Sequence, residues 1–291
     1  MDTKRKSIPD AIKRELRQEV GFGCPVKGCG NPYLEYHHFD PPVHIQAHNE
    51  VKGMIALCPE HHRKADGGSY TVEQLHSMKQ DVDNATLVRG RLDWLRRDML
   101  AVVGGNFYYE TPKIIVIDGH DVVALERDSD GYLRLSIELL SILDEERIVM
   151  QANSWENIGA PSDLRSPPQG KELEVHYSNG DMLHIRFIEI NTVEEACSRY
   201  KTDIFLRNSL ISFPLTVVEV ALEIGGTNIK ISPDATTLGG AVIKGCLTTN
   251  CGAGISADFG FHWRHSPKWK LASRVTSVDG GNVINVKFGR K

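Results

Sequence analysis

The sequence has no long hydrophobic run, and that absence excludes most helical membrane proteins. No apolar stretch approaches the roughly 18 residues that a membrane-spanning helix needs. The basic N-terminal segment, residues 1–20, has no apolar core, so we expect it not to act as a secretory signal. These two absences predict a cytoplasmic protein that has no membrane partner.

The chain also lacks an excess of positive charge. Its 34 Lys and Arg face 38 Asp and Glu, and a net charge of −4 argues against general coating of nucleic acid. Residues 1–100 are nearly neutral, so the acidic excess lies in the remainder. Two cationic clusters either contact phosphates or form solvated helix faces. They are Lys4, Arg5, Lys6, Lys13, Arg14 and Arg17, and Arg89, Arg91, Arg96 and Arg97.

A disulfide framework is not expected in a cytoplasmic chain, so the six cysteines need another role. Cys24, Cys29 and Cys58 lie in the first 60 residues beside most of the histidines, which indicates a metal site. The other three are interpreted as core thiols. These are Cys197, Cys246 and Cys251.

The first hundred residues predict short helices and strands. Residues 7–21 favour a helix with Ser7 as N-cap and Gly21 at its end. Short strands are expected in "YLEYHHF" and "MIALC", and a helix is expected to begin at Pro59. Further helices are predicted over 71–84 and over 88–105, where Leu92, Leu95 and Leu100 would share one side.

From about residue 106 the segments become short, β-branched and separated by turns. "SNGD" at 178–181 indicates a hairpin, and one helix is expected near 192–201. The pattern predicts an α+β protein in which residues 106–291 form a mainly β domain, either a sandwich or a short β-solenoid. "IDGHD", with Asp118, His120 and Asp121, is interpreted as a turn with exposed tips. "FHWRHSPKWK" at 261–270 either stacks on nucleic acid or caps the core through Trp263 and Trp269.

Two short-spaced pairs of metal-binding side chains predict a structural zinc site. Cys24 and Cys29 lie in the turn "CPVKGC", and Cys58 and His61 lie in "CPEH" at an expected helix N-terminus. Structural zinc takes four Cys or His ligands from two such pairs, and a helix N-terminus favours a thiolate. We therefore expect zinc to join these four residues.

This assignment leaves His62 for another purpose. Neighbouring residues of a helix point about 100° apart, so His61 and His62 should face different surroundings. The natural partner of His62 is the second histidine pair, His37 and His38, in "YHHFD". Because adjacent strand residues face opposite sides, one of that pair can bind a second metal with His62 while the other contacts water or substrate.

These residues resemble the HNH, or ββα-metal, nuclease family over roughly residues 20–66, and plausibly to about 85. The resemblance is carried by Cys24, Cys29, "YHHF", "MIALC" and "CPEHHRK". It implies that His38 is the general base and that His37 and His62 hold a catalytic divalent ion. It also implies a small zinc-bound ββα-metal nuclease domain, with flanking helices, within residues 1–100.

The chain departs from the family pattern at two positions. His61 stands where the family often has Cys, and the two are equivalent as zinc ligands. Gly53 stands where the family usually has Asn, so the third protein contact at the site is open. Asn49 is one substitute, and His44 and His48 are further candidates for contact with metal or phosphate.

The resemblance predicts hydrolysis of DNA phosphodiester bonds. A divalent cation offsets the charge of the phosphate and of the leaving oxygen, while His38 removes a proton from water. Mg²⁺ prefers oxygen ligands and Mn²⁺ accepts imidazole better, so we expect Mg²⁺ or Mn²⁺ at the catalytic site. Arg63 and Lys64 either neutralise phosphates or form a solvated helix face.

Three functional hypotheses follow. The first is a metal-dependent DNA endonuclease, used in restriction or anti-phage defence and controlled by its second domain. The second is a zinc-stabilised module that binds nucleic acid or protein without catalysis, which Gly53 favours. The third is a subunit that becomes active only with a partner. In each case the second domain would bind DNA, a partner protein or another copy of the chain.

Overall fold

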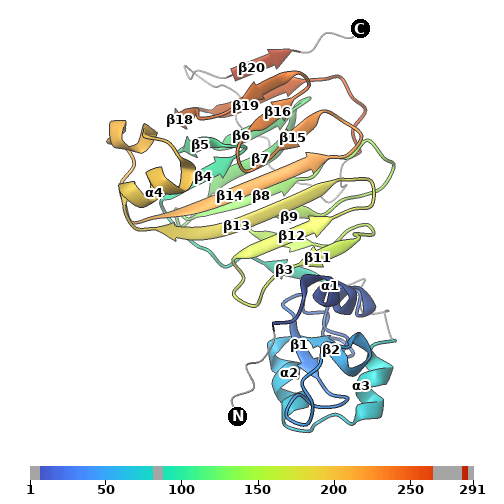
Figure 1. Ribbon diagram of the computed structural model, residues 1–291. Helices are drawn as coiled ribbons and strands as arrows, with labels where there is room; N and C mark the ends of the chain where they lie inside the picture. The colour runs from blue at the N-terminus through green and yellow to red at the C-terminus, as the bar shows by residue number, and fades with distance from the viewer. Residues whose placement is uncertain (1–6, 81–87, 265–283, 288–291) are drawn as a thin grey trace.

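The protein is described by a computed structural model that covers residues 7–80, 88–264 and 284–287. Residues 7–80 form an N-terminal unit of small helices and one two-stranded sheet, and the other described residues form a larger β-rich part (Figure 1). The expected α+β class, mainly β, is confirmed. No described helix has both the length and the apolar character to span a bilayer.

The N-terminal unit is built around two short antiparallel strands. Its elements are α1 (Asp10–Glu19), β1 (Glu35–His38), the 3-10 helix η1 (Val51–Gly53), β2 (Met54–Leu57), α2 (Pro59–Asp66) and α3 (Val72–Met78). In the sheet, His37 lies opposite Ile55 and His38 opposite Met54. All four residues of β2 are buried, and Leu16 and Leu75 pack against them from the helices. The buried sheet therefore fixes the positions of His37 and His38 on β1.

The predicted helices of this unit form with two differences. The helix expected over 7–21 begins at Asp10, and its N-cap is Pro9 without a side-chain hydrogen bond, so Ser7 is not the cap. Its end at Gly21 is confirmed, because Gly21 adopts a φ of 62° that favours glycine. The helix expected over 71–84 is present as α3, and residues 81–84 lie outside the described residues.

The β-rich part contains two large sheets. The first has the order β20-β19-β6-β7-β8-β9-β10-β3, and the second has β11-β12-β13-β14-β15-β16-β17, with β4 paired to β14 and β5, and β18 paired to β5. The first sheet comprises β3 (Arg89–Arg91), β6 (Lys113–Ile117), β7 (His120–Arg127), β8 (Leu133–Glu138), β9 (Val149–Gln151), β10 (Ser154–Glu156), β19 (Ala253–Asp258) and β20 (Ile284–Lys287). The second comprises β4 (Met99–Val103), β5 (Asn106–Tyr109), β11 (Asp163–Arg165), β12 (Glu172–His176), β13 (Met182–Ile190), β14 (Leu215–Ile224), β15 (Ile229–Ile231), β16 (Thr236–Leu238), β17 (Ala241–Ile243) and β18 (Leu247–Thr249).

One hydrophobic core joins the two sheets. Fully buried side chains from both, such as Ile115 and Leu135 on the first and Ile185 and Leu222 on the second, belong to the same apolar cluster. Two sheets that share a core are what the sandwich alternative requires. A second cluster packs α4 (Val193–Tyr200) and the 3-10 helix η3 (Ile204–Arg207) on the second sheet.

Local signals in this part are mostly confirmed. "SNGD" connects β12 to β13, which pair antiparallel from His176 opposite Met182. The helix expected near 192–201 is α4, and the Thr192 side chain caps it by accepting a hydrogen bond from the Glu195 amide. Of the three cysteines interpreted as core thiols, Cys197 is partly buried and packs against the core cluster under α4. Cys246 and Cys251 are also only partly buried and belong to none of the core clusters of the described residues, so the interpretation is wrong for these two.

The helix predicted over 88–105 is wrong, because this segment forms β3 and β4. All five residues of β4 are buried, and the strand lies between β14 and β5 in the second sheet. The leucines fit a helical period by chance, whereas "MLAVV" is a continuous apolar run typical of a strand buried on both faces. Gly104 and Gly105, at φ of 61° and 67°, then turn the chain into β5. The large sheets therefore include residues from Arg89 onward.

Two arginines of the first cationic cluster pair with a carboxylate of the β-rich part. Arg17 donates to Asp163 through Nη2 and Nε, at 2.6 and 3.0 Å, and Arg14 donates to the same carboxylate at 3.2 Å. Arg17 and Asp163 are both buried, so their ion pair joins α1 to β11. Tyr33 adds a bond between its hydroxyl and the Arg91 amide at 2.9 Å. The two parts of the chain are thus fastened together at several points. Lys4, Arg5 and Lys6 lie outside the described residues.

The "IDGHD" turn forms as predicted, but Asp118 is not an exposed tip, and Asp121 is buried and pairs with Lys113. Asp118 accepts hydrogen bonds from the amides of Phe259, Gly260 and Phe261 and from the indole of Trp263. Burial raises the pKa of Asp118, but these donors outweigh it and hold the pKa below its usual range. Trp263 is 7% exposed and belongs to the core, which favours the core-capping alternative. Trp269 lies outside the described residues.

Glu138 gives the β-rich part a stability that should depend on pH. This carboxyl is 1% exposed, and burial, followed by the nearby charge of Asp121, raises its pKa from 4.5 to about 7. The folded protein therefore binds more protons than the unfolded chain between these values, and stability falls as pH rises through this window. The loss corresponds to roughly 3 kcal/mol.

We expect Glu138→Gln to remove this pH dependence. Urea unfolding at pH 8 should show a gain of about 3 kcal/mol over wild type, with little difference near pH 4.5, because a neutral amide has no ionisation cost. Glu194→Gln, an exposed carboxylate on α4, serves as the control and should change stability equally at both pH values. A constant difference between Glu138→Gln and wild type across this range would contradict the expectation.

Candidate metal centre

Two turns of the backbone bring the predicted zinc ligands together. Gly28, at a φ of 78°, allows the tight turn that carries Cys29, and the Cys29 amide donates to the Val26 carbonyl at 2.9 Å. Cys58 is the N-cap of α2, and Pro59 occupies the first helical position. The Cys58–His61 pair therefore lies on the first turn of a helix, facing the Cys24–Cys29 turn.

The four ligand atoms have the spacing of a tetrahedral metal site. His61 Nδ1 lies 3.4 Å from Cys24 Sγ and 3.2 Å from Cys58 Sγ, and the sulfurs of Cys29 and Cys58 are 3.9 Å apart. A tetrahedral zinc ion would set edges of about 3.8 Å between sulfurs and about 3.5 Å between sulfur and nitrogen. This Cys₃His cluster can therefore hold a metal ion such as zinc.

The burial of the Cys₃His cluster favours a bound cation, because thiolates there need a positive charge beside them. Burial raises the pKa of the Cys24 and Cys29 thiols, and neighbouring sulfurs raise them further. Burial also lowers the pKa of His61, which keeps its imidazole neutral. A thiolate in this place therefore requires a positive ion beside it, and metal binding would release the thiol protons.

A second cluster lies on the other side of α2. His37 Nδ1 is 3.1 Å from one oxygen of Asp66, and His62 Nδ1 is 3.2 Å from the other. The rings of His37 and His62 are 5.1 Å apart and nearly perpendicular. Together, His37, His62 and Asp66 form a set of ligand atoms that could hold a metal ion. His61 and His62 thus diverge, as the helical geometry predicts.

Two acidic residues that contact these histidines are not among the site residues expected from the sequence. Asp66 lies four residues after His62 on the same face of α2, and this spacing was a usable signal. Glu35 lies two residues before His37 on the same face of β1, and its carboxylate is 3.8 Å from His62 Nδ1. Burial and the neighbouring His62 lower the pKa of His37, while Asp66 opposes them, so His37 favours the neutral form that binds metal.

His38 points away from His37 and is held by the loop between β1 and β2. Its Nε2 lies 2.9 Å from the His48 carbonyl oxygen. A carbonyl can only accept, so in neutral His38 the proton is on Nε2 and the lone pair on Nδ1. His48 in turn donates from Nε2 to the Pro41 carbonyl and accepts on Nδ1 from the Glu50 amide. Both nitrogens of His48 are thus used within the loop, and its expected contact with metal or phosphate is wrong.

Gly53 is required by packing, which explains why the family Asn has no place here. A Cβ atom at Gly53 would lie 1.9 Å from the Asp40 carbonyl oxygen and 2.8 Å from the His48 ring. The Gly53 carbonyl also accepts hydrogen bonds from the amides of Phe39 and Asp40. Asn49 is half-buried in the same loop and is not part of either metal cluster.

A small cavity opens beside the second cluster. It has a volume of about 260 Å³, and its lining includes His37, His38 and Asp66 together with the exposed His44. His38 also lines the cavity, but it is only 6% exposed and its Nδ1 is buried. Arg63 and Lys64 lie exposed on α2. Lys64 pairs with Glu60 at 2.6 Å, and Arg63 donates to the Pro59 carbonyl.

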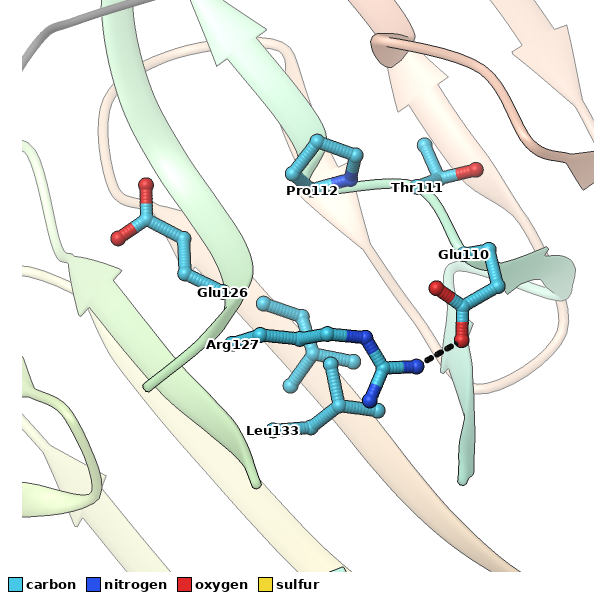
Figure 2. Close-up of a pocket in the computed structure, with 7 residues that line it drawn as sticks. Glu110, Thr111, Pro112, Glu126, Arg127 and Leu133 are labelled. Carbon is cyan, nitrogen blue, oxygen red and sulfur yellow. Dashed lines mark hydrogen bonds and ion pairs between the residues drawn. The ribbon is translucent and has the colours of Figure 1, made fainter. Parts of the chain in front are cut away.

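A different cavity in the β-rich part has no comparable chemistry. Figure 2 shows Arg127 and Glu110 paired across it, while Glu126 lies apart from them. The cavity holds about 380 Å³ and neither histidine nor cysteine lines it. The charge of Arg127 is thus already balanced, so the histidine and cysteine clusters of the N-terminal unit remain the candidate functional site.

The chain was compared with known proteins at the level of family, sequence and structure. No protein-family model, no curated protein and no solved structure matches it. The chemistry of the site therefore follows from its own donor atoms. These are a Cys₃His cluster on one side of α2, and His37, His62 and Asp66 on the other.

Proposed function

We propose that this protein is a metal-dependent endonuclease that hydrolyses phosphodiester bonds of DNA. The observation that carries the proposal is the arrangement around α2. A Cys₃His cluster lies on one side of this helix, and a His₂Asp cluster with His38 beside it lies on the other. This arrangement matches what the HNH resemblance implies for His37, His38 and His62.

The His₂Asp cluster suits a catalytic divalent cation. Asp66 adds an oxygen ligand and a negative charge to the two imidazoles. Mn²⁺ binds such a mixed set readily, and Mg²⁺ binds it better than a set of imidazoles alone. A cation bound there would stabilise the negative charge that develops on the phosphate and on the leaving oxygen. His37 and His62 approach from different elements, so β1 and α2 together set the shape of the site.

His38 is the general base in this proposal. Its Nδ1 is buried in this structure, so the loop between β1 and β2 has to shift to admit the attacking water. The Nδ1 lone pair then takes a proton from that water, and the water oxygen forms a bond to phosphorus as the bond to the 3′-oxygen breaks. The leaving oxygen receives a proton from solvent, which gives a 5′-phosphate and a 3′-hydroxyl. The His48 carbonyl stabilises the protonated imidazole and keeps the ring in one orientation.

The Cys₃His cluster has a structural role in the proposal. Bound zinc would join the Cys24–Cys29 turn to the first turn of α2, and His62 follows directly after the last ligand. The position of His62 relative to β1 would then depend on zinc. This dependence is the reason to expect that zinc supports catalysis without entering it.

A metal titration tests the proposal. Purified protein should nick or cut plasmid DNA when Mn²⁺ or Mg²⁺ is added, with Mn²⁺ the better activator. His62→Ala should lower the rate at least about 10²-fold, because it removes a metal ligand. His176→Ala, a partly buried histidine of β12 that lines neither the metal clusters nor their cavity, is the matched control and should cut like wild type. Gel electrophoresis of the plasmid measures both.

Two other results would change the assignment. Binding of DNA without cleavage under any divalent metal would support the zinc-stabilised binding module. A silent protein that cuts after a partner protein is added would support the subunit hypothesis. Equal cleavage by wild type and His62→Ala would remove the His₂Asp cluster from the reaction.

A further inference from the structure

A large cavity lies in the β-rich part, away from both metal clusters. It has a volume of about 730 Å³ and is enclosed by β13, β14, the C-terminal end of α4, and the turns after β4, β15 and β17. Figure 1 shows these elements on the side of the second sheet that carries α4. The volume lies within the range of small-molecule sites, roughly 300 to 1,000 Å³.

The cavity has an apolar floor. Val102 and Phe107 contribute from β4 and β5, and Ala221 contributes from β14. The Phe107 ring is held by an edge-to-face contact with Tyr200 at 5.4 Å. A pocket with an apolar floor and a polar rim suits a ligand that has both a flat or apolar portion and a charged portion.

The rim carries more positive than negative charge, although this half of the chain is acidic overall. Arg199 donates to Glu219 through Nε and Nη2, at 2.8 and 3.0 Å, so that carboxylate is already balanced. Arg186, Lys201 and Lys244 make no ion pair with other described residues, although Glu219 lies opposite Arg186 in the sheet. Asp234 is the one rim carboxylate without an ion pair among the described residues.

Lys201 occupies a backbone conformation that lysine rarely adopts. It follows the last residue of α4 with φ of 50° and ψ of 46°, a left-handed position that most helices fill with glycine. A non-glycine residue there has a cost in stability, and such costs concentrate at functional sites. Its side chain lines the cavity, so the strained position places a cation at the rim.

We propose that this cavity binds a small phosphate-bearing organic anion, of the size and chemistry of a nucleotide. Arg186, Lys201 and Lys244 hold the phosphate, and the floor formed by Val102, Phe107 and Ala221 contacts the nucleotide base. The three cations without an ion pair exceed the one such carboxylate, Asp234, by two positive charges. A phosphate monoester carries nearly two negative charges at neutral pH, which matches this excess. The inference does not depend on the nuclease proposal, because the cavity shares no residue with the metal clusters.

Calorimetric titration of the full chain with AMP tests the inference, with inorganic phosphate and a short single-stranded oligonucleotide as the other probes. We expect AMP to bind, and Arg186→Ala and Lys201→Gly each to weaken the Kd at least tenfold. Glycine suits the left-handed position, so Lys201→Gly should leave the melting temperature unchanged or higher. Lys230→Ala, an exposed lysine on β15 outside the cavity, should bind AMP like wild type.

Several outcomes would overturn the inference. Absence of AMP binding at millimolar concentration is one, and equal binding by all variants is another. Inorganic phosphate that binds as tightly as AMP would show that the apolar floor takes no part. Oligonucleotide binding that AMP does not displace would assign the cations to a nucleic-acid backbone instead.

Discussion

His38→Gln is expected to slow DNA cleavage about 10²- to 10⁴-fold, the range that a positioned general base contributes. The glutamine amide can still donate to the His48 carbonyl, so the loop between β1 and β2 should keep its shape. The amide cannot take a proton from water, so only the rate of the hydrolysis step should fall. The rate is measured under saturating Mn²⁺ and excess enzyme, so that binding and product release do not limit it.

His176→Gln is the matched control for this change. His176 lies on β12, outside the metal clusters and the cavity beside them, so cleavage should stay within a few-fold of wild type. Zinc content and the melting temperature of both variants should equal those of wild type. Undiminished cleavage by His38→Gln, with a folded protein, would show that another group activates the water.

Cys58→Ser is expected to remove bound zinc and to unfold the N-terminal unit while the β-rich part stays folded. Cys58 is both a member of the Cys₃His cluster and the N-cap of α2, so its loss separates the helix from the Cys24–Cys29 turn. Zinc binding supplies about 10 to 16 kcal/mol in small zinc-binding peptides. Here Leu16, Ile55 and Leu75 still form a core, so we expect a loss of at least about 3 kcal/mol.

Zinc analysis of the dialysed protein and limited proteolysis measure this effect. Wild type should hold one zinc per chain, and Cys58→Ser should hold none and be cut first within residues 7–80. Cys197→Ser, a partly buried cysteine of α4, should keep both zinc and protease resistance. One zinc per chain in Cys58→Ser would show that the ion binds elsewhere.

The parts of the site that sequence could predict are those set by short spacings. Cys58 and His61 are three residues apart on a helix turn, and His61 and His62 must diverge because successive helical residues rotate by about 100°. His37 and His38 face opposite sides because a strand alternates. The same spacing rules pointed to Asp66, but carboxylates are so common on helix surfaces that its position alone carried little weight.

What sequence could not predict depends on contacts between distant residues. Nothing local to residues 88–105 shows that "MLAVV" lies between β14 and β5, and its leucines fit a helix equally well. The requirement for glycine at position 53 appears only when the Asp40 carbonyl is beside it. Likewise, the pairing of Arg17 with Asp163 joins positions 146 apart, so the charge cluster looked available for phosphate.

The Arg17–Asp163 ion pair also bears on how DNA can approach. It is buried, and both nitrogens of one guanidinium edge engage the carboxylate, so α1 cannot swivel on β11 as it would on a flexible tether. In the proposed nuclease, the two sheets would therefore keep one position relative to a bound duplex, and the footprint on DNA should extend farther to one side of the cut than to the other.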